Sequence, residues 1–205
     1  MIAIINYGAG NIKSVQNALL AIGADSRLIS SKDELLAGGF THAILPGVGA
    51  FGEAITKLKE RELDYALHEY VARGGALLGI CLGFQILFER GYEFGSHEGL
   101  GLLKGEVVSF NKNKFKSSLK IPHMGWNEIN FTKQNSLTKG LKPSEYFYFV
   151  HSFHAICDDD LALGVCEYGY KFIAAAGANR VWGFQPHPEK SANAGLKILK
   201  NFKEM

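Results

Sequence analysis

Apolar and polar residues follow a strand-and-helix pattern through the first half of the chain. Short apolar runs predict four buried strands, at residues 2–6, 27–29, 42–45 and 76–80. The segments between them carry apolar residues at helical spacing and predict helices at about 11–22, after an N-cap at Ser31, and at about 53–73 with an interruption near Arg61. This alternation is typical of a mostly parallel central sheet flanked by helices, with the functional site at the carboxyl ends of the strands.

The pattern changes after Gly91 to short β segments separated by turn residues. We predict six strands, at residues 106–110, 126–131, 146–151, 163–167, 172–176 and 181–184, followed by a helix at about 193–202. These strands are expected to add antiparallel members to the same sheet and to bring His187 over Cys81. Because no linker, repeat or low-complexity segment interrupts the chain, residues 1–205 are interpreted as a single α/β domain.

Composition excludes several classes of protein. The net charge of +2 and the hydrophobic content of 47% are ordinary for a soluble globular chain and lack the strongly basic balance of a nucleic-acid binder. The basic run at residues 112–120 is interpreted as a solvated loop. The N-terminus begins directly with a buried-strand pattern and no secretory signal, and no apolar stretch has membrane-spanning length. We therefore expect a cytoplasmic protein that binds neither nucleic acid nor a membrane.

The three cysteines, Cys81, Cys157 and Cys166, form no Cys-x-x-Cys pair. An odd number without such a pair argues against a disulfide framework and against a zinc site, and it favours a reducing compartment. We interpret Cys157 and Cys166 as structural residues and expect no metal and no cofactor.

The most informative segment is Gly79-Ile80-Cys81-Leu82-Gly83, where the apolar run at 76–80 turns into a helix. Glycines on both sides of the cysteine predict a nucleophile elbow, in which the backbone kinks and exposes the sulfur above the sheet. The helix that follows, with apolar positions through Phe88, points free N–H groups at the cysteine and favours the nucleophilic thiolate. A buried strand cysteine followed by an ordinary helix is the alternative interpretation.

His187-Pro188-Glu189 follows the apolar run at 181–184 and supplies the groups that a thiol nucleophile requires. A base must remove the proton from the thiol, and a third group must fix the tautomer and orientation of the base. Pro188 favours an extended backbone at His187, so we predict that His187 and Glu189 point to the same side. Taken alone, the tripeptide would instead be a surface turn.

Pro46-Gly47-Val48-Gly49 directly follows the predicted strand at 42–45. Its glycines allow backbone N–H groups to turn inward, as an oxyanion hole requires of a loop. An ordinary strand-to-helix turn is the alternative, but the position at the end of a strand favours a partnership with Cys81.

In this order the three motifs resemble the class I, triad-type glutamine amidotransferases. Further segments narrow the resemblance to the glutaminase-subunit family of imidazole glycerol phosphate synthase, over nearly the whole chain. These segments are Asn6-Tyr7-Gly8-Ala9-Gly10-Asn11, Pro122-His123-Met124-Gly125-Trp126-Asn127, Tyr148-Phe149-Val150-His151-Ser152 and Pro188-Glu189-Lys190-Ser191. The string at 122–127 is the most specific of them, whereas Gly-x-Cys-x-Gly alone indicates only a superfamily.

The resemblance implies a flavodoxin-like class I glutaminase fold and hydrolysis of glutamine to glutamate and ammonia through a cysteine thioester. The implied catalytic residues are Cys81, His187 and Glu189. The implied oxyanion hole consists of backbone N–H groups of Leu82 and of Val48 or Gly49.

The resemblance also implies residues that position the substrate glutamine. These are Gln85, Ser152 and Phe153. Two of them have simpler interpretations, since Gln85 could be a plain helix-surface residue and Ser152 a plain strand-end residue.

Members of this family dock on a (β/α)8-barrel cyclase subunit, release ammonia into it and are nearly inactive without it. The resemblance therefore implies a heterodimer whose cyclase makes imidazole glycerol phosphate and an aminoimidazole carboxamide ribotide in histidine biosynthesis. The positions that match the family's partner contacts are Asn11, Trp126, Tyr148 and Lys190. The alternatives are a helix N-cap for Asn11, core aromatics for Trp126 and Tyr148, and a solvated side chain for Lys190. Trp126 lies between polar residues after Gly125, which favours the interface.

Two positions depart from the family pattern. Pro186 stands where an aromatic residue usually precedes the His-Pro-Glu motif, and Phe84 stands where methionine is more frequent. Proline fixes its own φ and donates no hydrogen bond, so Pro186 changes the packing behind His187. The change at Phe84 conserves volume closely enough to be tolerated.

Three other functions stay open at the level of sequence. A paralogue could deliver ammonia to another synthase, such as one that aminates a surface sugar. A non-catalytic regulatory subunit is disfavoured because Cys81, His187 and Glu189 are all present. A flavodoxin-like nucleotide-binding module, suggested by residues 8–11, lacks the full glycine fingerprint and an acidic residue at the end of a second strand.

Overall fold

The computed structural model describes residues 1–8, 10–115 and 117–205. Ala9 of the N-terminal motif and Lys116 of the basic run lie outside the described residues. The helices are α1 Ile12–Ala21, α2 Lys32–Ala37, α3 Phe51–Glu60, α4 Leu63–Ala72, α5 Leu82–Gln85 and α6 Ala192–Lys203, with 3₁₀ turns η1 Lys112–Lys114 and η2 Pro188–Lys190. The strands are β1 Ile2–Ile5, β2 Ser26–Ile29, β3 His42–Gly47, β4 Ala76–Cys81, β5 Phe88–Gly91, β6 His97–Glu98, β7 Leu103–Ser109, β8 His123–Phe131, β9 Ser144–His151, β10 Phe153–Ile156, β11 Ala162–Tyr168, β12 Tyr170–Ala178 and β13 Val181–Phe184.

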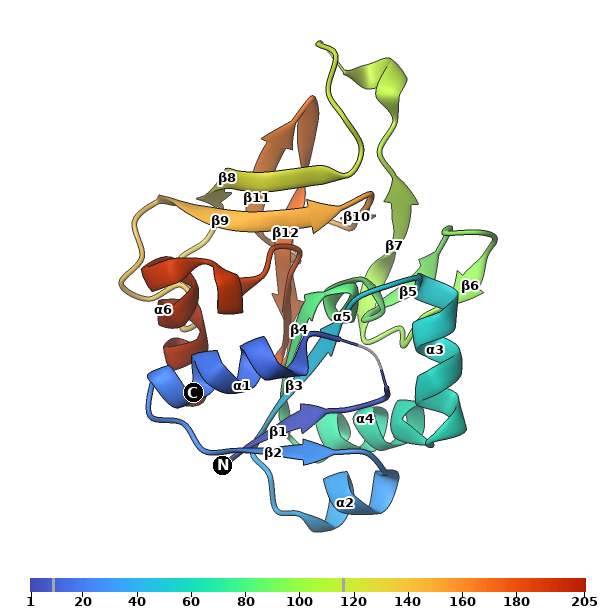
Figure 1. The fold of residues 1–205 in the computed structure, drawn as a ribbon, viewed down its shortest axis with the longest axis vertical. Helices are drawn as coiled ribbons and strands as arrows, with labels where there is room; N and C mark the ends of the chain where they lie inside the picture. The colour runs from blue at the N-terminus through green and yellow to red at the C-terminus, as the bar shows by residue number, and fades with distance from the viewer. Residues whose placement is uncertain (9, 116) are drawn as a thin grey trace.

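The described strands form one sheet whose main path runs β2-β1-β3-β4-β13-β12-β10-β7-β5-β6 (Figure 1). The segment from β2 to β13 is entirely parallel. Beyond β13 the pairs along this path are antiparallel, except for the parallel pair β5 and β7. Strands β11, β8 and β9 branch from β12 as a further antiparallel layer. This arrangement confirms the predicted α/β class, with a parallel core and antiparallel strands added to the same sheet.

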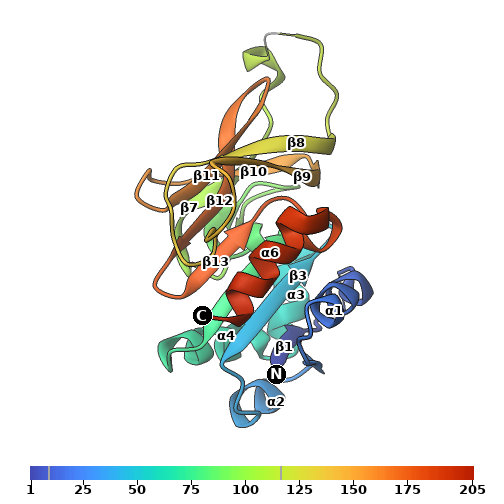
Figure 2. The same ribbon diagram turned by 90° about the vertical axis from the view of Figure 1, so that its left-hand side faces the viewer.

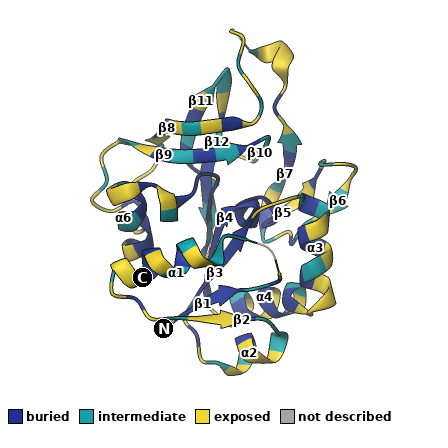
Figure 3. Ribbon diagram, viewed as in Figure 1, coloured by how far each residue is buried: buried dark blue, intermediate teal, exposed yellow. Residues whose placement is uncertain are grey.

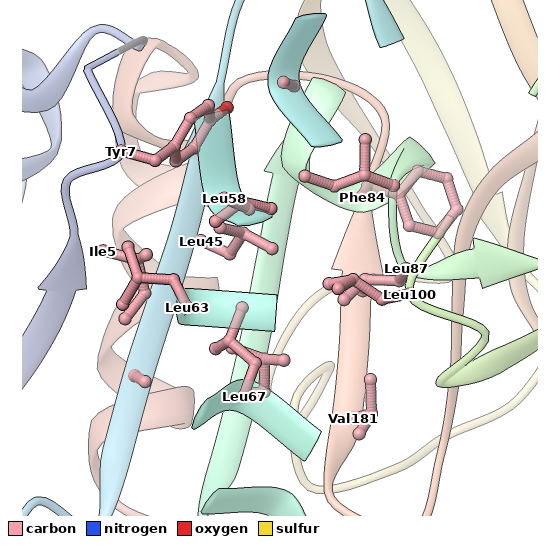
Figure 4. Packing of buried hydrophobic residues seen from close by; sticks show 14 of the residues in the cluster. Ile5, Tyr7, Leu45, Leu58, Leu63, Leu67, Phe84, Leu87, Leu100 and Val181 are labelled. Carbon is pink, nitrogen blue, oxygen red and sulfur yellow. The ribbon is translucent and has the colours of Figure 1, made fainter. Parts of the chain in front are cut away.

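Alternate side chains of β1 enter two different hydrophobic clusters, because successive strand residues point to opposite faces. Ile5 packs in a cluster with residues of α2, α3 and α4, including Leu58 and Leu67 (Figure 4). Ile4 packs in a second cluster with residues of α1 and α6. The two views of the ribbon show these helices on opposite sides of the parallel strands (Figures 1 and 2). Both faces of the parallel core are therefore covered, as an α/β sheet requires.

The predicted helix boundaries follow local signals in the sequence. Ser31 is the N-cap of α2, and its hydroxyl accepts a hydrogen bond from the N–H of Glu34 at 3.4 Å. The predicted interruption near Arg61 separates α3 from α4, and Glu62 has a left-handed φ of 53°. The chain reverses there, so that two short helices cover the sheet in place of one long one.

Three strands, β5, β6 and β10, were not predicted from the sequence. The elbow helix α5 is a single turn, and Phe88 begins strand β5 instead of continuing the helix. All residues from Phe84 to Phe88 except Gln85 are fully buried. A continuously buried segment has no polar face, so its periodicity cannot distinguish helix from strand. Within the described residues, no helix is both long and apolar enough to cross a membrane.

Candidate active site

The three motifs singled out in the sequence meet at one edge of the sheet. Strands β3, β4 and β13 are neighbours and parallel, with Gly47 beside Cys81 and Phe184 beside Ile80 in the register. Their carboxyl ends therefore lie side by side. Parallel strands of α/β sheets generally form their sites at this edge.

Cys81 itself carries the backbone kink of the elbow, with φ 56° and ψ −111°. The flanking glycines serve a different purpose from the one expected. A Cβ on Gly83 would lie 1.8 Å from the carbonyl oxygen of Leu45, and a Cβ on Gly79 would lie 2.7 Å from that of Gly83. The glycines thus allow α5 to pack directly on the strands, whereas the strain is borne by the cysteine. Strained non-glycine residues of this kind concentrate at functional sites.

A cavity of about 400 Å³ opens over the cysteine. Its walls include eight residues that the sequence had indicated: Cys81, His187, Val48, Gly49, Leu82, Gln85, Ser152 and Phe153. Four wall residues had no expected role: Glu93, Pro122, Val150 and His151. A larger cavity of about 980 Å³ lies elsewhere, beside the basic loop, and contains neither Cys81 nor His187.

His187 and Glu189 form a buried pair. The imidazole Nδ1 lies 2.8 Å from Glu189 Oε1, and the two side chains are 3% and 1% exposed. A carboxylate can only accept, so Nδ1 carries the proton and Nε2 is the basic nitrogen. The pair does not lie on an extended segment, as the sequence suggested, because η2 begins directly after His187. The turn curls Glu189 back beneath the imidazole ring.

The pKa of His187 is raised from its ordinary value to about 10. Burial opposes this shift because it disfavours the charged ring. Interactions with the Cys81 sulfur and the Glu189 carboxylate outweigh burial and favour the imidazolium. In the described structure, Nε2 makes no standard hydrogen bond and is free to exchange a proton.

The backbone of His187 is held by β9 and by the start of α6. Its N–H donates to the carbonyl of Tyr148 at 2.9 Å. The Ser191 hydroxyl donates to the carbonyl of His187 at 2.6 Å and accepts from the N–H of Tyr148 at 3.0 Å. Buried Pro186 precedes His187, and the residue before it, Gln185, bonds through its N–H to Ala174 at 2.8 Å. The proline therefore interrupts neither of the backbone bonds that flank it.

The loop after β3 lies on the other side of the cysteine. Gly49 has a φ of +99°, and no atom lies within 4 Å of the position that a Cβ would occupy. The buried Tyr7 hydroxyl donates to the carbonyl of Pro46 at 3.1 Å and anchors the start of the loop. Leu82, which follows Cys81, is buried at the first position of α5. Val48 and Gly49 of this loop and Leu82 of α5 line the same cavity as Cys81.

Gln85 and Phe153 are joined on the cavity wall. The amide nitrogen of Gln85 donates to the carbonyl of Phe153 at 2.9 Å and to Oε1 of Gln185 at 3.0 Å. On another wall, Glu93 accepts a hydrogen bond from the N–H of Phe51 at 2.8 Å through Oε2. Sequence reasoning did not identify Glu93, because a single glutamate in a loop has no informative spacing. Only the fold brings it beside the cysteine.

Three of the four residues expected to contact a partner form one surface cluster. Trp126 and Tyr148 are cross-strand neighbours on β8 and β9, with ring centroids 6.3 Å apart. The ammonium of Lys190 lies 5.9 Å from the centre of the Tyr148 ring. Trp126 is 53% exposed, so it is not a core residue, and the exposed colour alternates along β8 in Figure 3. Asn11 is partly exposed before α1, and its side chain makes no capping hydrogen bond.

The site brings together the side chains that nucleophilic catalysis requires. Among residues 1–8, 10–115 and 117–205, no group of three histidine, cysteine or acidic side chains could hold a metal ion. A buried cysteine, a histidine with a raised pKa and an orienting carboxylate together form the constellation for nucleophilic attack on a carbonyl carbon.

Comparison with known proteins agrees with this chemistry. Residues 3–205 match the family Glutamine amidotransferase class-I. The chain is 51% identical to the imidazole glycerol phosphate synthase subunit HisH of Sulfurimonas denitrificans, over 98% of this chain and 97% of that protein. It is 48% identical to the subunit of the same name from Wolinella succinogenes, over 100% of both chains.

Solved structures resemble the fold at lower identity. The structure of PurLQS from Thermotoga maritima matches with a TM-score of 0.76 and 20% identity, over 99% of this chain and 97% of that chain. At such identity the likeness concerns the fold alone. Family and full-length relatives together show that the chain belongs to the class-I glutamine amidotransferases, among the HisH subunits of imidazole glycerol phosphate synthase.

Proposed function

We propose that this chain hydrolyses glutamine to glutamate and ammonia as the glutaminase subunit of imidazole glycerol phosphate synthase, in histidine biosynthesis. The observation that carries the proposal is that Cys81 and His187 line one cavity and Glu189 bonds to His187, within a chain that matches HisH subunits over its full length. We further propose that residues 1–205 act as one catalytic domain.

Cys81 is the nucleophile in this proposal. Its sulfur attacks the side-chain amide carbon of glutamine, and the electron pair of the C=O bond moves to the oxygen. His187 already holds the thiol proton on Nε2 when the attack begins and delivers it to the departing ammonia, which leaves a thioester on Cys81. His187 then removes a proton from a water molecule that attacks the thioester and releases glutamate. Glu189 keeps Nδ1 protonated throughout and orients the ring.

The oxyanion formed in each step is assigned to backbone N–H groups of Leu82 and of Val48 or Gly49. One donor in such a hole typically lowers the barrier by about 3 kcal/mol. The conformation of the loop after β3 therefore matters as much to the rate as the triad does.

Glutamine is assigned to the wall formed by Gln85, Ser152 and Phe153. Both N–H groups of the Gln85 amide are already used, which leaves its Oε1 as an acceptor for the substrate. Glu93 is added to this set, because a carboxylate on the cavity wall is suited to the α-ammonium group of glutamine.

The proposed partner is a (β/α)8-barrel cyclase that receives the ammonia in a heterodimer. The names of the relatives describe a subunit of a synthase, and the Trp126–Tyr148–Lys190 cluster supplies an exposed aromatic surface next to the site. Full-length similarity to HisH subunits favours this acceptor over a surface-sugar synthase. Asn11 is assigned to the same interface. All three cysteines are free thiols, which fits the cytoplasmic compartment expected from the sequence.

The test is glutamate release by the purified chain, with and without a cyclase partner of HisH subunits and the nucleotide substrate of that cyclase. The wild-type complex is expected to release glutamate. Cys81→Ala and His187→Ala are expected to abolish the release, and Glu189→Ala to reduce it less, because the carboxylate only orients and stabilises the ring. An unchanged rate for His187→Ala would require another base, and a wild-type complex without activity would favour a regulatory subunit.

A further inference from the structure

Two buried histidines outside the triad, His123 and His151, lie on the two strands of the aromatic cluster, next to the proposed glutamine cavity. They are cross-strand neighbours on β8 and β9, and Nδ1 of His123 lies 2.9 Å from Nε2 of His151. His151 is a wall residue of the cavity, whereas His123 lies behind it. Neither has a role in the chemistry described above.

The direction of each hydrogen bond in this pair follows from its ends. Nδ1 of His151 lies 2.8 Å from the carbonyl oxygen of Phe153, which can only accept, so Nδ1 carries the proton. A neutral ring then has an unprotonated Nε2, which must accept from Nδ1–H of His123. Nε2 of His123 is consequently unprotonated as well and accepts from the amide nitrogen of Asn127 at 3.2 Å.

The orientation of Asn127 is independently fixed. Its amide nitrogen also donates to the carbonyl of Glu167 at 3.0 Å, and its Oδ1 accepts from the N–H of Glu128 at 2.8 Å. The chain of donors therefore runs in one direction, from Asn127 through His123 and His151 to the carbonyl of Phe153.

Both rings are neutral and fixed in place. Burial lowers the pKa of His123 to about 4 and that of His151 to about 3, so neither ring is charged at neutral pH. The His123 ring stacks between Tyr168, at 4.0 Å between centroids, and Phe149, at 4.7 Å. A stacked, neutral ring with a hydrogen bond at each nitrogen has one orientation only.

The chain of donors ends where the proposed substrate site begins. The carbonyl oxygen of Phe153 accepts from His151 and also from Gln85, so both of its lone pairs are used. At its other end, Asn127 is adjacent to Trp126 on β8. One uninterrupted series of hydrogen bonds thus connects the strand of the exposed aromatic cluster with the wall that holds Gln85.

We propose that His123 and His151 are positioning residues for glutamine. The series of hydrogen bonds from Asn127 through His123 and His151 to Phe153, which we call the relay, fixes the Phe153 carbonyl and Gln85 on the cavity wall. The inference rests on the proposed glutaminase function for its kinetic consequence, but the relay itself is a property of the structure. Without the His123 donor, Nε2 of His151 becomes a buried acceptor with no partner, and its ring loses the constraint that directs Nδ1 to Phe153.

The kinetic test compares two substitutions of His123 in the complete complex. His123→Leu removes the donor, whereas His123→Asn places an amide nitrogen near the position of Nδ1 and retains it. We expect His123→Leu to raise KM for glutamine about tenfold with a smaller effect on kcat, because the triad is untouched, and His123→Asn to recover most of the loss. Equal KM values for wild type and a folded His123→Leu would overturn the inference.

The structural test measures the protonation of each histidine nitrogen in the wild-type chain, so it requires neither enzyme activity nor a substitution. In the ¹⁵N-labelled wild-type chain, NMR is expected to show a protonated Nδ1 and an unprotonated Nε2 for both His123 and His151. A protonated Nε2 on either ring would contradict the relay. A wild-type complex that shows these tautomers but releases no glutamate would leave the relay intact and would refute the proposed function instead.

Discussion

The carbonyl oxygen of Tyr148 accepts a hydrogen bond from the N–H of His187 at 2.9 Å. Tyr148 belongs to the exposed aromatic cluster and His187 is the proposed base, so a single backbone contact joins the proposed docking surface to the triad. Ser191 reinforces it, because its hydroxyl bridges the N–H of Tyr148 and the carbonyl of His187. A displacement of β9 would therefore move the backbone of His187 directly, through this hydrogen bond.

Removing this bridge is expected to slow catalysis without unfolding the protein. Ser191→Ala deletes two buried hydrogen bonds beside His187 and should lower kcat by up to about 30-fold, since the two together are worth about 2 kcal/mol. Helix α6 should be unaffected, because the Ser191 side chain makes no capping bond. Ser144→Ala is the matched control: it removes a hydroxyl at the start of β9, the strand of Tyr148, that bonds to Glu128 at 2.7 Å and lies away from the triad. Equal kcat values for the two variants would contradict the role of the bridge.

Cys81 should be the one cysteine that reacts rapidly with a glutamine-like electrophile. Burial raises the pKa of Cys157 to about 11, with a further contribution from the acidic residues that follow it. Burial also raises the pKa of Cys166 to about 12. Both stay protonated at neutral pH and are poor nucleophiles. The adduct of a chloroketone analogue of glutamine can be located by peptide mass spectrometry, and labelling of Cys157 or Cys166 with Cys81 unmodified would refute the elbow assignment.

The raised pKa of His187 predicts how its ring titrates. Because the folded-state pKa is about 10 and the ordinary value is 6.5, the ring should keep its second proton throughout the neutral range and lose it only near pH 10. In Cys81→Ala the sulfur no longer favours the imidazolium, so the titration should move to lower pH. NMR of labelled histidine follows both proteins. Identical midpoints in the two would show that the thiol and the imidazole do not interact.

The sequence predicted where the three motifs meet because that depends on topology. Cys81, Gly47 and Phe184 end neighbouring parallel strands, and strands that alternate with helices place their carboxyl ends together. The glycines of the elbow were recognised, but their role was not: the need for a close approach between Gly83 and Leu45 depends on a contact between separate segments. Residue spacing contains no information about such a contact.

Residues that reach the site from outside the parallel core could not be predicted from the order of strands and helices. Glu93 and the paired histidines 123 and 151 acquire their positions from β5, β8 and β9, and of these β5 was missed because its first residue, Phe88, continues the fully buried run that follows the elbow. Strands β6 and β10 are short, with 2 and 4 residues, and offer too few positions for a period to be recognised. The predicted elbow helix extended through Phe88, whereas α5 ends at Gln85, because the buried run does not show where the helix stops. Hydrophobic pattern therefore predicts the sheet more reliably than its edges.

The aromatic cluster predicts where a cyclase would bind. Trp126→Ala should weaken association with the partner at least tenfold, because a large exposed aromatic at the centre of an interface typically carries more than about 1.4 kcal/mol. Its effect on Cys81 labelling in the isolated chain should be small. Tyr65→Ala is the control, since Tyr65 is 71% exposed but lies on α4, in the lower half of Figure 1 and well away from β8. Calorimetric titration with the partner measures the affinity of each variant. Equal affinities for Trp126→Ala and Tyr65→Ala would exclude this face as the docking surface.

The loop after β3 explains why such a glutaminase should be slow alone and fast in its complex. Gly49 holds a φ of +99°, a conformation that glycine adopts readily and other residues do not. Rotation of the peptide between Val48 and Gly49 would exchange an N–H for a carbonyl at the oxyanion position, so two loop states with different activity are accessible at low cost. A partner that binds the productive state more tightly raises the rate by that difference in affinity.

Gly49→Ala tests this account without steric interference, because no atom lies within 4 Å of the added Cβ. Alanine at a positive φ costs about 1–2 kcal/mol, so the substitution should shift the loop away from its present conformation by roughly tenfold. If that conformation is the resting state, basal glutamate release should rise by about this factor, and the further activation by the cyclase should fall correspondingly. The measurement is the rate at saturating glutamine, with and without the purified partner. A variant that keeps wild-type basal activity and wild-type activation would show that the loop is not the element that the partner controls.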